Sequence, residues 1–506
     1  MLNNIYLLFP DLFLSITVSL QLILIAVLSK KDKRVSQVFK TLLITILSLF
    51  IASYMYLSSG LNITEVLIGG GILKTNALIE ICKAFLCFMG GCVLILNYSY
   101  KSYNKLELLE VSLIINLCVI GFLIICNSND LLILYLGIEL YSLSFYVLAT
   151  INRWSQKSTE AGLKYFVLGS LASGLYLFGT SIIYFITGEL NYNGIYAYIA
   201  SGEISNLLIT GCYFLLIGLL FKIAAAPLHM WAPDVYEGAP LLITALFATI
   251  PKLPLLVALI NLLYGPLVTM FYEIQPLIIT CVVFSMLIGS IAGLNQIKLK
   301  RLIAYSSISH VGFILLGLSL GTTAGVKASL IYVFIYSITT IALFAVIFLF
   351  IKKTDYITEI AGYGKRNPIL ALSLSLLLFS IAGVPPLAGF YSKFLILYES
   401  LNKGFYFLTI IAVISSTIAL IYYIRITKWM FFKDSKEYNL KIISDIIQPG
   451  ENLNFAHVLI LGIFLFLVIS FLLYPSIWIK LINYILISSL IKAWWLSGRK
   501  QLSWKQ

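Results

Sequence analysis

The stretch that decides the fold is Gly383-Val384-Pro385-Pro386-Leu387-Ala388-Gly389-Phe390-Tyr391-Ser392-Lys393, in the middle of a long apolar run. A second stretch, Phe221-Lys222-Ile223-Ala224-Ala225-Ala226-Pro227-Leu228-His229, places a proline late in another apolar run. Each proline removes a backbone hydrogen bond from a helix. Lipid cannot replace that bond, so each break must be buried in protein or hydrated. The sequence therefore predicts two broken membrane helices, each with a lysine nearby.

The composition indicates a membrane protein. Of the 506 residues, 60% are hydrophobic and 11% are charged, whereas a soluble domain carries about 25% charged residues. The formal net charge of +13 is explained by basic membrane loops, so no nucleic-acid partner is expected. The chain enters its first span almost at once, and no cleavable signal is expected. We therefore expect an all-α polytopic membrane protein.

Apolar runs of about 20 residues predict about fourteen transmembrane helices. No loop between them is large enough to hold a cofactor; the longest is 428–453. The expected limits are 5–29, 37–58, 76–98, 108–126, 130–151, 161–188, 205–230, 240–264, 272–295, 301–319, 327–351, 369–400, 405–427 and 454–479.

Basic residues are frequent in every second connection between the predicted spans. Most basic loop residues follow odd-numbered spans, and the even-numbered connections carry only Lys74, Lys327 and Lys403. The positive-inside rule then places the odd loops in the cytoplasm or matrix and both termini on the other side. A basic tail departs from the rule, and its run 480–495 is expected as an interfacial helix rather than a fifteenth span. The tail carries Lys480, Lys492, Arg499, Lys500 and Lys505.

The two breaks lie five spans apart. An odd offset means that the second unit enters the membrane from the opposite side, which is typical of inverted repeats in transporters. The sequence therefore predicts two inverted five-helix repeats. The expected divisions are N-terminal helices 1–3 at 1–105, a first repeat (helices 4–8) at 106–265, a second repeat (helices 9–13) at 266–435, and helix 14 with the basic tail at 436–506.

Four ionisable residues lie deep inside apolar runs: Glu139, Lys222, Lys252 and Lys393. A charge at bilayer depth costs roughly 2.5–3.5 kcal/mol on insertion scales, so such residues usually face a protein interior or a wet path. The energy of a buried carboxylate depends on its distance to a cation, and changing that distance moves a proton. We therefore predict a proton relay through these four residues, with Lys393 at the corresponding place in the second unit as the exit-side station.

Each of the four also has a structural alternative. Glu139 could be a protonated acid bonded to the hydroxyls of Tyr141 or Ser142, and a membrane lysine can extend to the interface. Lys252 lies about twelve residues from either end of its span, where reaching the interface is hard.

Further ionisable residues are weaker candidates. His310, after three nearby serines, suits a water wire, although a hydrogen-bonded core histidine fits equally. Lys164 lies near the inner end of its span, where extension to the interface is a rival explanation. Asp11 is expected at the membrane interface, and Glu80 and Lys83 are expected to neutralise each other across one helix turn.

Redox chemistry is not expected in this chain. The seven cysteines form neither a CxxC pair nor a Cys/His metal cluster, and buried thiols explain them. No Gly-rich nucleotide loop follows a strand, and no haem-like His pair is present. Energy must therefore arrive from a partner.

The motif set resembles the antiporter-like membrane subunits of proton-pumping NADH:quinone oxidoreductase (respiratory complex I), in particular the subunit 2 type, which is subunit N in bacteria. The similarity covers roughly 130–435. The segments that carry it are LGIEL at 136–140, EAGLKYF at 160–166, FKIAAAPLHMWAPDVYEGAP at 221–240, RLIAYSSISHVG at 301–312 and GVPPLAGFYSKF at 383–394.

The resemblance implies that Glu139, Lys222, Lys252 and Lys393 form the proton path. It also implies that NADH, FMN, iron–sulfur clusters and ubiquinone act on partner subunits, with no cofactor or metal on this chain. The implied partners are other membrane-arm subunits, including neighbouring antiporter-like ones, and lipids. The implied location is the mitochondrial inner membrane; a bacterial plasma membrane or a thylakoid stays open.

Two other functions remain open from the residues alone. A subunit of a multi-subunit sodium/proton antiporter would share the broken-helix lysines. A non-transporting membrane scaffold would share the hydropathy. Exchange of sodium without NADH would favour the first, and full coupling after removal of all four charges would favour the second.

Overall fold

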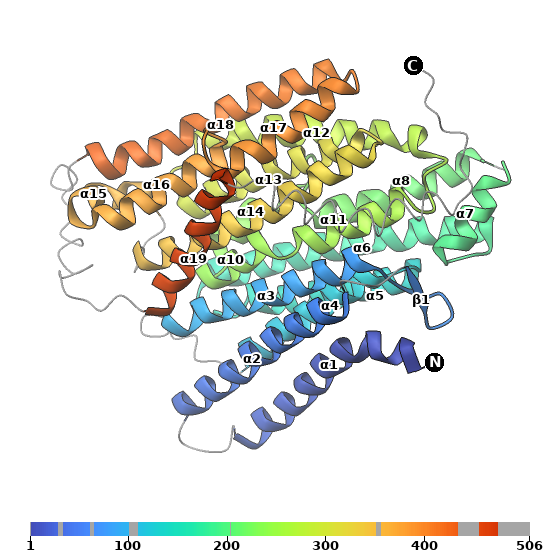
Figure 1. The fold of residues 1–506 in the computed structure, drawn as a ribbon, viewed down its shortest axis with the longest axis horizontal. Coiled ribbons are helices and arrows are strands. Elements are labelled where there is room, and N and C mark those ends of the chain that lie inside the picture. Colours follow the sequence, from blue (N-terminus) through green and yellow to red (C-terminus); the bar gives the residue numbers. More distant parts are fainter. Residues whose placement is uncertain are drawn as a thin grey trace.

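The computed structural model describes residues 2–28, 34–60, 65–100, 110–202, 204–350, 356–433 and 455–473. The described chain is a bundle of roughly parallel and antiparallel helices, with one small hairpin at one end (Figure 1). The N-terminal group is α1 (Leu2–Leu28), α2 (Arg34–Gly60), the antiparallel strands β1 (Val66–Ile68) and β2 (Leu73–Thr75), and α3 (Ala77–Tyr100).

The next two groups carry the broken helices. The first contains α4 (Glu110–Asn127), α5 (Leu131–Ala149), α6 (Gln156–Thr187), α7 (Tyr192–Ala200), α8 (Asn206–Lys222), α9 (Trp231–Gly238), α10 (Leu241–Thr249) and α11 (Lys252–Leu263). The second contains α12 (Phe271–Leu294), α13 (Leu299–Ser319), α14 (Thr323–Phe350), η1 (Ile357–Ile360), α15 (Tyr363–Arg366), α16 (Pro368–Ala382), α17 (Ala388–Asn402) and α18 (Tyr406–Phe432). Helix α19 (Phe455–Leu473) follows.

The helix lengths confirm a polytopic membrane protein. Within the described residues, eleven segments are long and apolar enough to cross a membrane, and three shorter apolar helices, α8, α16 and α19, complete the predicted set. Helices α10 and α11 together form one of the eleven. Every predicted span therefore falls on a helix or on a pair of half-helices.

The packing repeats between the two groups. Helix α4 packs on α5 and α11, as α12 packs on α13 and α18. Helix α5 packs on α6 as α13 packs on α14, and α6 packs on α8 as α14 packs on α16 and α17. Each equivalence is offset by five spans, which confirms the two predicted five-helix repeats.

The two ends of the bundle agree with the predicted topology, in which connections after even-numbered spans lie at one end and connections after odd-numbered spans lie at the other. The start of α1, the β1–β2 hairpin and α7 lie at one end in Figure 1, and α15 lies at the other. At the first end, the side chains of Asn129 and Asn191 both donate to the carbonyl of Gly71, at 2.7 and 2.8 Å. These bonds join the hairpin to the α4–α5 and α6–α7 connections. We call these two ends the even end and the odd end.

Several local expectations were wrong. The seventh span was expected to run to 230 with its break at Pro227, but α8 already ends at Lys222, and the expected loop contains the short helix α9. The eighth span also breaks, between Thr249 and Lys252, where Pro251 directly precedes the new helix and has no N–H to continue the old one. The short helix α7 and the hairpin were not predicted. The basic tail and its helix at 480–495 lie outside the described residues.

Candidate functional site

Lys222 lies at the carboxyl end of α8, and its side chain is 4% exposed. Its Nζ donates to the hydroxyl of Tyr146 on α5 at 3.2 Å. The carbonyl of Phe221, freed by the end of the helix, accepts the indole N–H of Trp231 at 2.9 Å. The helix end is therefore closed by another side chain, and the lysine depends on a partner from α5.

Glu139 lies on α5, two helical turns before Tyr146, and acts electrostatically on Lys222. Among the described residues, no ion pair within 4.0 Å joins the two, and Oε1 of Glu139 is buried without a hydrogen-bond partner. Ser142 donates to the carbonyls of Ile138 and Glu139, and the hydroxyl of Tyr141 has no partner. The structure therefore does not form the bonds of the alternative interpretation, in which a protonated Glu139 bonds to Tyr141 or Ser142.

Lys252 is the first residue of α11 and is 3% exposed. Its Nζ donates to the hydroxyl of Tyr336 on α14 at 2.6 Å and lies 3.9 Å from the centre of the same ring. The amine is therefore held by both the oxygen and the π face of one side chain.

His310 lies on α13 beside this pair. Its ring is 4.9 Å from the ring of Tyr336, and its Nδ1 is 2.6 Å from the hydroxyl of Tyr332. Lys252 and Lys393 both act on it electrostatically. The histidine therefore contacts two tyrosines, one of which, Tyr336, holds Lys252.

Lys393 lies in α17 and is 6% exposed. Its Nζ donates to the carbonyl of Ala382, the last residue of α16, at 2.8 Å and lies 5.2 Å from the centre of the Phe313 ring. Phe313 stacks on Tyr332 at 5.8 Å. The break between α16 and α17 therefore provides the acceptor that holds the lysine.

The break itself depends on Gly383. Its φ is +87°, a left-handed conformation that costs a side-chain-bearing residue roughly 1–2 kcal/mol. A Cβ at this position would also lie 2.7 Å from Cδ of Lys393. Glycine is therefore required here both for the turn and for the path of the lysine chain.

The two lysines lie on different sides of their breaks. Lys222 precedes its break, and Lys393, expected at the corresponding place in the second unit, follows its break. The repeats place both amines at a helix interruption, although from opposite half-helices.

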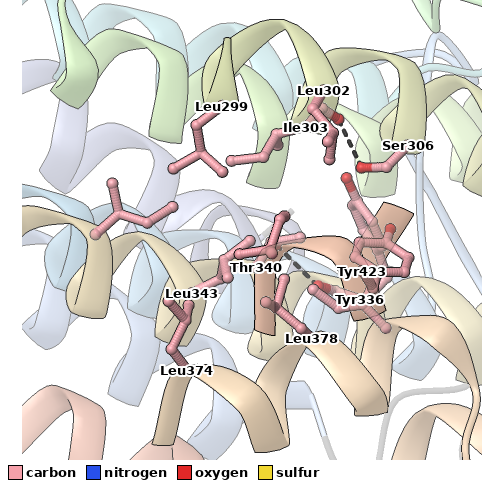
Figure 2. Close-up of a pocket in the computed structure, with 13 residues that line it drawn as sticks. Leu299, Leu302, Ile303, Ser306, Tyr336, Thr340, Leu343, Leu374, Leu378 and Tyr423 are labelled. Carbon is pink, nitrogen blue, oxygen red and sulfur yellow. Dashed lines mark hydrogen bonds between the residues drawn. The ribbon is translucent and has the colours of Figure 1, made fainter. Parts of the chain in front are cut away.

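A small cavity lies between α13, α14, α16 and α18 (Figure 2). Its lining is mostly aliphatic, and the lining residues that carry hydroxyl groups are Ser306, Tyr336, Thr340 and Tyr423. Tyr336, which holds Lys252, therefore borders the cavity.

The remaining site candidate, Lys164, lies apart from the buried chain. It is 43% exposed and pairs with Glu160 at 2.7 Å and with Asp234 at 3.0 Å. Asp234 also pairs with Arg301 at 3.3 Å, across the boundary of the two repeats. Lys164 therefore belongs to an ion-pair network at the odd end.

Glu237 is the centre of that network. It contacts Lys298 and pairs with Arg301 at 3.0 Å, and its side chain is 14% exposed. Burial opposes its ionisation, but hydrogen bonds from Lys298 and Arg301 outweigh this and hold the pKa of Glu237 below its ordinary value. The acidic string after α8 thus joins the first repeat to the start of α13.

The tyrosines of the site were not identified from the sequence. Tyr146, Tyr332 and Tyr336 each hold an amine or the imidazole, yet the chain contains 32 tyrosines. Their helical spacing does not show which faces meet. Within the described residues, no group of three His, Cys, Asp or Glu side chains could hold a metal ion.

The fold and the buried cation chain define a class: inverted-repeat membrane subunits with lysines at broken helices. Residues 128–419 match the family described as NADH:quinone oxidoreductase/Mrp antiporter, transmembrane, and the chain belongs to this family.

Curated relatives agree along most of the chain. NADH-quinone oxidoreductase subunit N of Pelagibacter ubique is 39% identical over 472 residues, covering 92% of this chain and 97% of the relative. NADH-ubiquinone oxidoreductase chain 2 of Marchantia polymorpha is 40% identical over 404 residues, covering 78% and 80%. These relatives confirm the resemblance found in the motifs.

Solved structures show the same fold. The chain superposes on a chain of respiratory complex I from Thermus thermophilus with a TM-score of 0.75 and 24% identity, covering 92% and 97% of the two chains. A chain of the Mrp complex from Dietzia sp. gives a TM-score of 0.81 at 19% identity, covering 95% and 97%. Both likenesses concern the fold alone.

Proposed function

We propose that this chain is the proton-translocating membrane-arm subunit of NADH:ubiquinone oxidoreductase, with a relay through Glu139, Lys222, Lys252 and Lys393. The observation that carries the proposal is the continuous set of contacts from Lys252 through Tyr336, His310, Tyr332 and Phe313 to Lys393. Buried amines, hydroxyls and an imidazole can each hold or release a proton, and the step past the Phe313 ring, which carries no exchangeable proton, requires water.

The first half of the relay uses a counter-charge. Glu139 acts on Lys222 from a distance, so a small movement of either side chain changes the stability of the charged amine. When the carboxylate moves away, the ammonium loses its support and passes a proton towards Lys252. Tyr146 keeps Lys222 oriented during this step.

Between Lys222 and Lys252 the contacts are mainly aromatic. Tyr146 packs on Tyr165, Tyr165 on Phe247, and Phe247 on Tyr236, with ring centres 4.8, 5.8 and 6.2 Å apart. The hydroxyl of Tyr236 is occupied by the carbonyl of Phe247 at 3.0 Å. This step therefore requires water to enter, and the aromatic cluster controls when it can do so.

His310 carries the proton between the two later lysines, and the cavity beside Tyr336 gives room for water next to the hydroxyl that holds Lys252. Lys393, which faces the break of the second repeat, is the last station. Lys164 has no part in the buried path, and its ion pairs support the odd-end network instead.

Energy for these steps comes from partner subunits, where electrons pass from NADH through FMN and iron–sulfur clusters to ubiquinone. Glu139 is suited to receive that signal, because it lies on a partly exposed face of α5. Leu136 and Leu143, one turn to either side, are 58% and 54% exposed. A neighbouring membrane-arm subunit on this face would set the position of the carboxylate, and lipids would cover the other apolar faces.

The working units follow the predicted divisions: 1–105, 106–265, 266–435 and 436–506. The first repeat receives the signal at Glu139, and the second contains the exit at Lys393. We place the protein in the mitochondrial inner membrane; the relative from Marchantia polymorpha bears the mitochondrial type of name, and the others are bacterial.

The test is proton pumping by the assembled complex in proteoliposomes, per NADH oxidised. Lys222→Met, Lys252→Met and Lys393→Met should assemble, because each removes a buried charge, and pumping should fall by about tenfold or more. The matched control is Lys157→Met, an exposed lysine in the first turn of α6. Unchanged pumping in the three buried variants would refute the relay.

The same vesicles distinguish the antiporter alternative. The proposal predicts that pumping requires NADH and is independent of sodium. Sodium/proton exchange by the purified chain without NADH would overturn it in favour of an ion-exchange subunit.

A further inference from the structure

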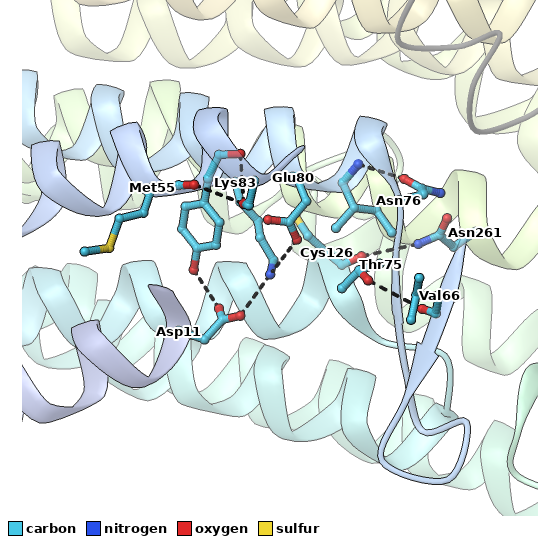
Figure 3. A network of polar contacts seen from close by, with 12 residues as sticks. Asp11, Met55, Val66, Thr75, Asn76, Glu80, Lys83, Cys126 and Asn261 are labelled. Atoms are coloured by element: carbon cyan, nitrogen blue, oxygen red, sulfur yellow. Dashed lines mark hydrogen bonds and ion pairs between the residues drawn. The ribbon is translucent and has the colours of Figure 1, made fainter. Parts of the chain in front are cut away.

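A second buried ion cluster lies outside the region that matches the family. It is formed by Asp11 on α1, Tyr56 on α2, and Glu80 and Lys83 on α3 (Figure 3). The side chains of Glu80 and Lys83 are 0% exposed, and Tyr56 is equally buried. Three helices therefore enclose a group of ionisable residues that the relay does not use.

The contacts converge on the amine. Nζ of Lys83 lies 3.0 Å from Oδ2 of Asp11 and 3.3 Å from Oε1 of Glu80. The hydroxyl of Tyr56 donates to Oδ1 of Asp11 at 2.7 Å, and its ring centre lies 4.9 Å from the amine. Asp11 is therefore part of a built site that joins α1 to α2 and α3.

The charges of the cluster do not balance. Two carboxylates face one ammonium, so full ionisation would leave one negative charge. The other titratable groups nearby are the thiols of Cys82, Cys87 and Cys126, and their ionisation would only add to the excess. An uncompensated buried charge is strongly unfavourable, so the cluster needs one more positive charge.

One oxygen atom of the cluster is available to bind this additional positive charge. Oε2 of Glu80 is buried and has no hydrogen-bond partner, whereas Oε1 accepts from Lys83. The described residues contain no group of three His, Cys, Asp or Glu side chains arranged for a metal ion. A proton requires only one oxygen, so it fits this site better than a metal cation.

We propose that Asp11, Glu80 and Lys83 form a second proton-holding site, which carries one exchangeable proton on its two carboxylates. Asp11, 25% exposed, is the member of the cluster that reaches the protein surface. Lys83 bridges both carboxylates, so its ammonium can give a proton to one acid while it takes a proton from the other. The proton thus enters at Asp11 and rests on Glu80.

The experiment is infrared difference spectroscopy of the purified assembled complex, read at the C=O stretch of protonated carboxylic acids in water and in heavy water. The wild type should show one band that Glu80→Gln lacks. Asp11→Asn should lack it too, because one carboxylate and one ammonium then balance without a proton. Glu273→Gln, an exposed acid at the start of α12, is the control and should keep the band.

Three outcomes decide the matter. Identical spectra for the wild type and Glu80→Gln would mean that both acids are ionised, and the proposal fails. A band that survives in Asp11→Asn would mean a proton held by burial alone, without charge balance, and it also fails. A wild-type band that sodium chloride removes but potassium chloride does not would assign the site to sodium. The readout is vibrational, so it is independent of the proton relay.

Discussion

Lys222 and Lys393 are both buried amines at broken helices, but different partners hold them. Lys222 bonds to a tyrosine hydroxyl on another helix and has a carboxylate at a distance. Lys393 bonds to the carbonyl of Ala382 at the end of a half-helix, and among the described residues no carboxylate pairs with it within 4.0 Å. The first lysine therefore has a partner that can move, and the second has a partner fixed in the backbone.

The difference assigns separate tasks to the repeats. A side-chain counter-charge can be displaced by a neighbouring subunit, so the first site can respond to a signal. A backbone carbonyl stays in place as long as the helix break does, so the second site keeps a constant environment. Four changes test this comparison.

The largest effect is expected from Glu139→Gln. Loss of the carboxylate removes the movable counter-charge of Lys222, and pumping per NADH should fall by about tenfold. The matched control is Glu399→Gln, a partly exposed acid in the second repeat. If both variants pump equally, the carboxylate has no special task in the first site. Pumping is measured in proteoliposomes, after the amount of complex has been checked on native gels.

Gly383→Ala should damage the second site alone. The added Cβ would lie 2.7 Å from Cδ of Lys393, and the left-handed backbone adds roughly 1–2 kcal/mol. Gly404→Ala shares the positive φ but meets no atom within 4 Å, so it separates strain from contact. We expect pumping to fall several-fold only in Gly383→Ala. Equal losses would show that strain alone matters.

Gly169→Ala should damage the first site by displacing the tyrosine that holds Lys222. Its Cβ would lie 2.1 Å from the hydroxyl of Tyr146, which must then leave Lys222. Overpacking of this kind costs about 1–3 kcal/mol. Gly174→Ala, on the same helix with no atom within 4 Å, is the control. A density map of the variant that still shows Tyr146 beside Lys222 would contradict the expectation.

Glu237→Gln tests the link between the repeats and should have the smallest effect. The folded pKa of Glu237 is lowered, so its contribution to stability is present above the ordinary carboxyl pKa and is lost as the pH falls through the folded value. The variant should lose about 1–3 kcal/mol at neutral pH. Melting temperatures of the two proteins should converge in acid; a constant difference across pH would exclude the charge as the cause.

The sequence predicted the spans and two breaks because these depend on local features. Runs of apolar residues fix the spans, and Pro227 and the pair at Pro385 and Pro386 fix the breaks in α8–α9 and α16–α17. The third break was missed because Pro251 also suits the start of a helix, and periodicity does not separate the two cases.

The partners of the buried charges could not be predicted from local sequence features. Tyr146 and Tyr336 reach their lysines across helices, and α5 meets α8, or α11 meets α14, only after the bundle has packed. Asp11 shows the same limit, because its position near a chain end suggested the interface, yet α2 and α3 provide partners for it. The four buried charges were identified by their cost in lipid, and their roles as a relay remain predictions.

The helix pair α10–α11 has a consequence for how the protein is made. Nearly all of its span, Leu241–Leu263, is buried within the bundle. Its neighbours include α3 and α4, made earlier, and α13 and α14, made later. During synthesis, the segment with Lys252 therefore lacks part of its surroundings until the ribosome has passed Phe350. Such a segment is made before all of the helices that cover it in the finished bundle are present.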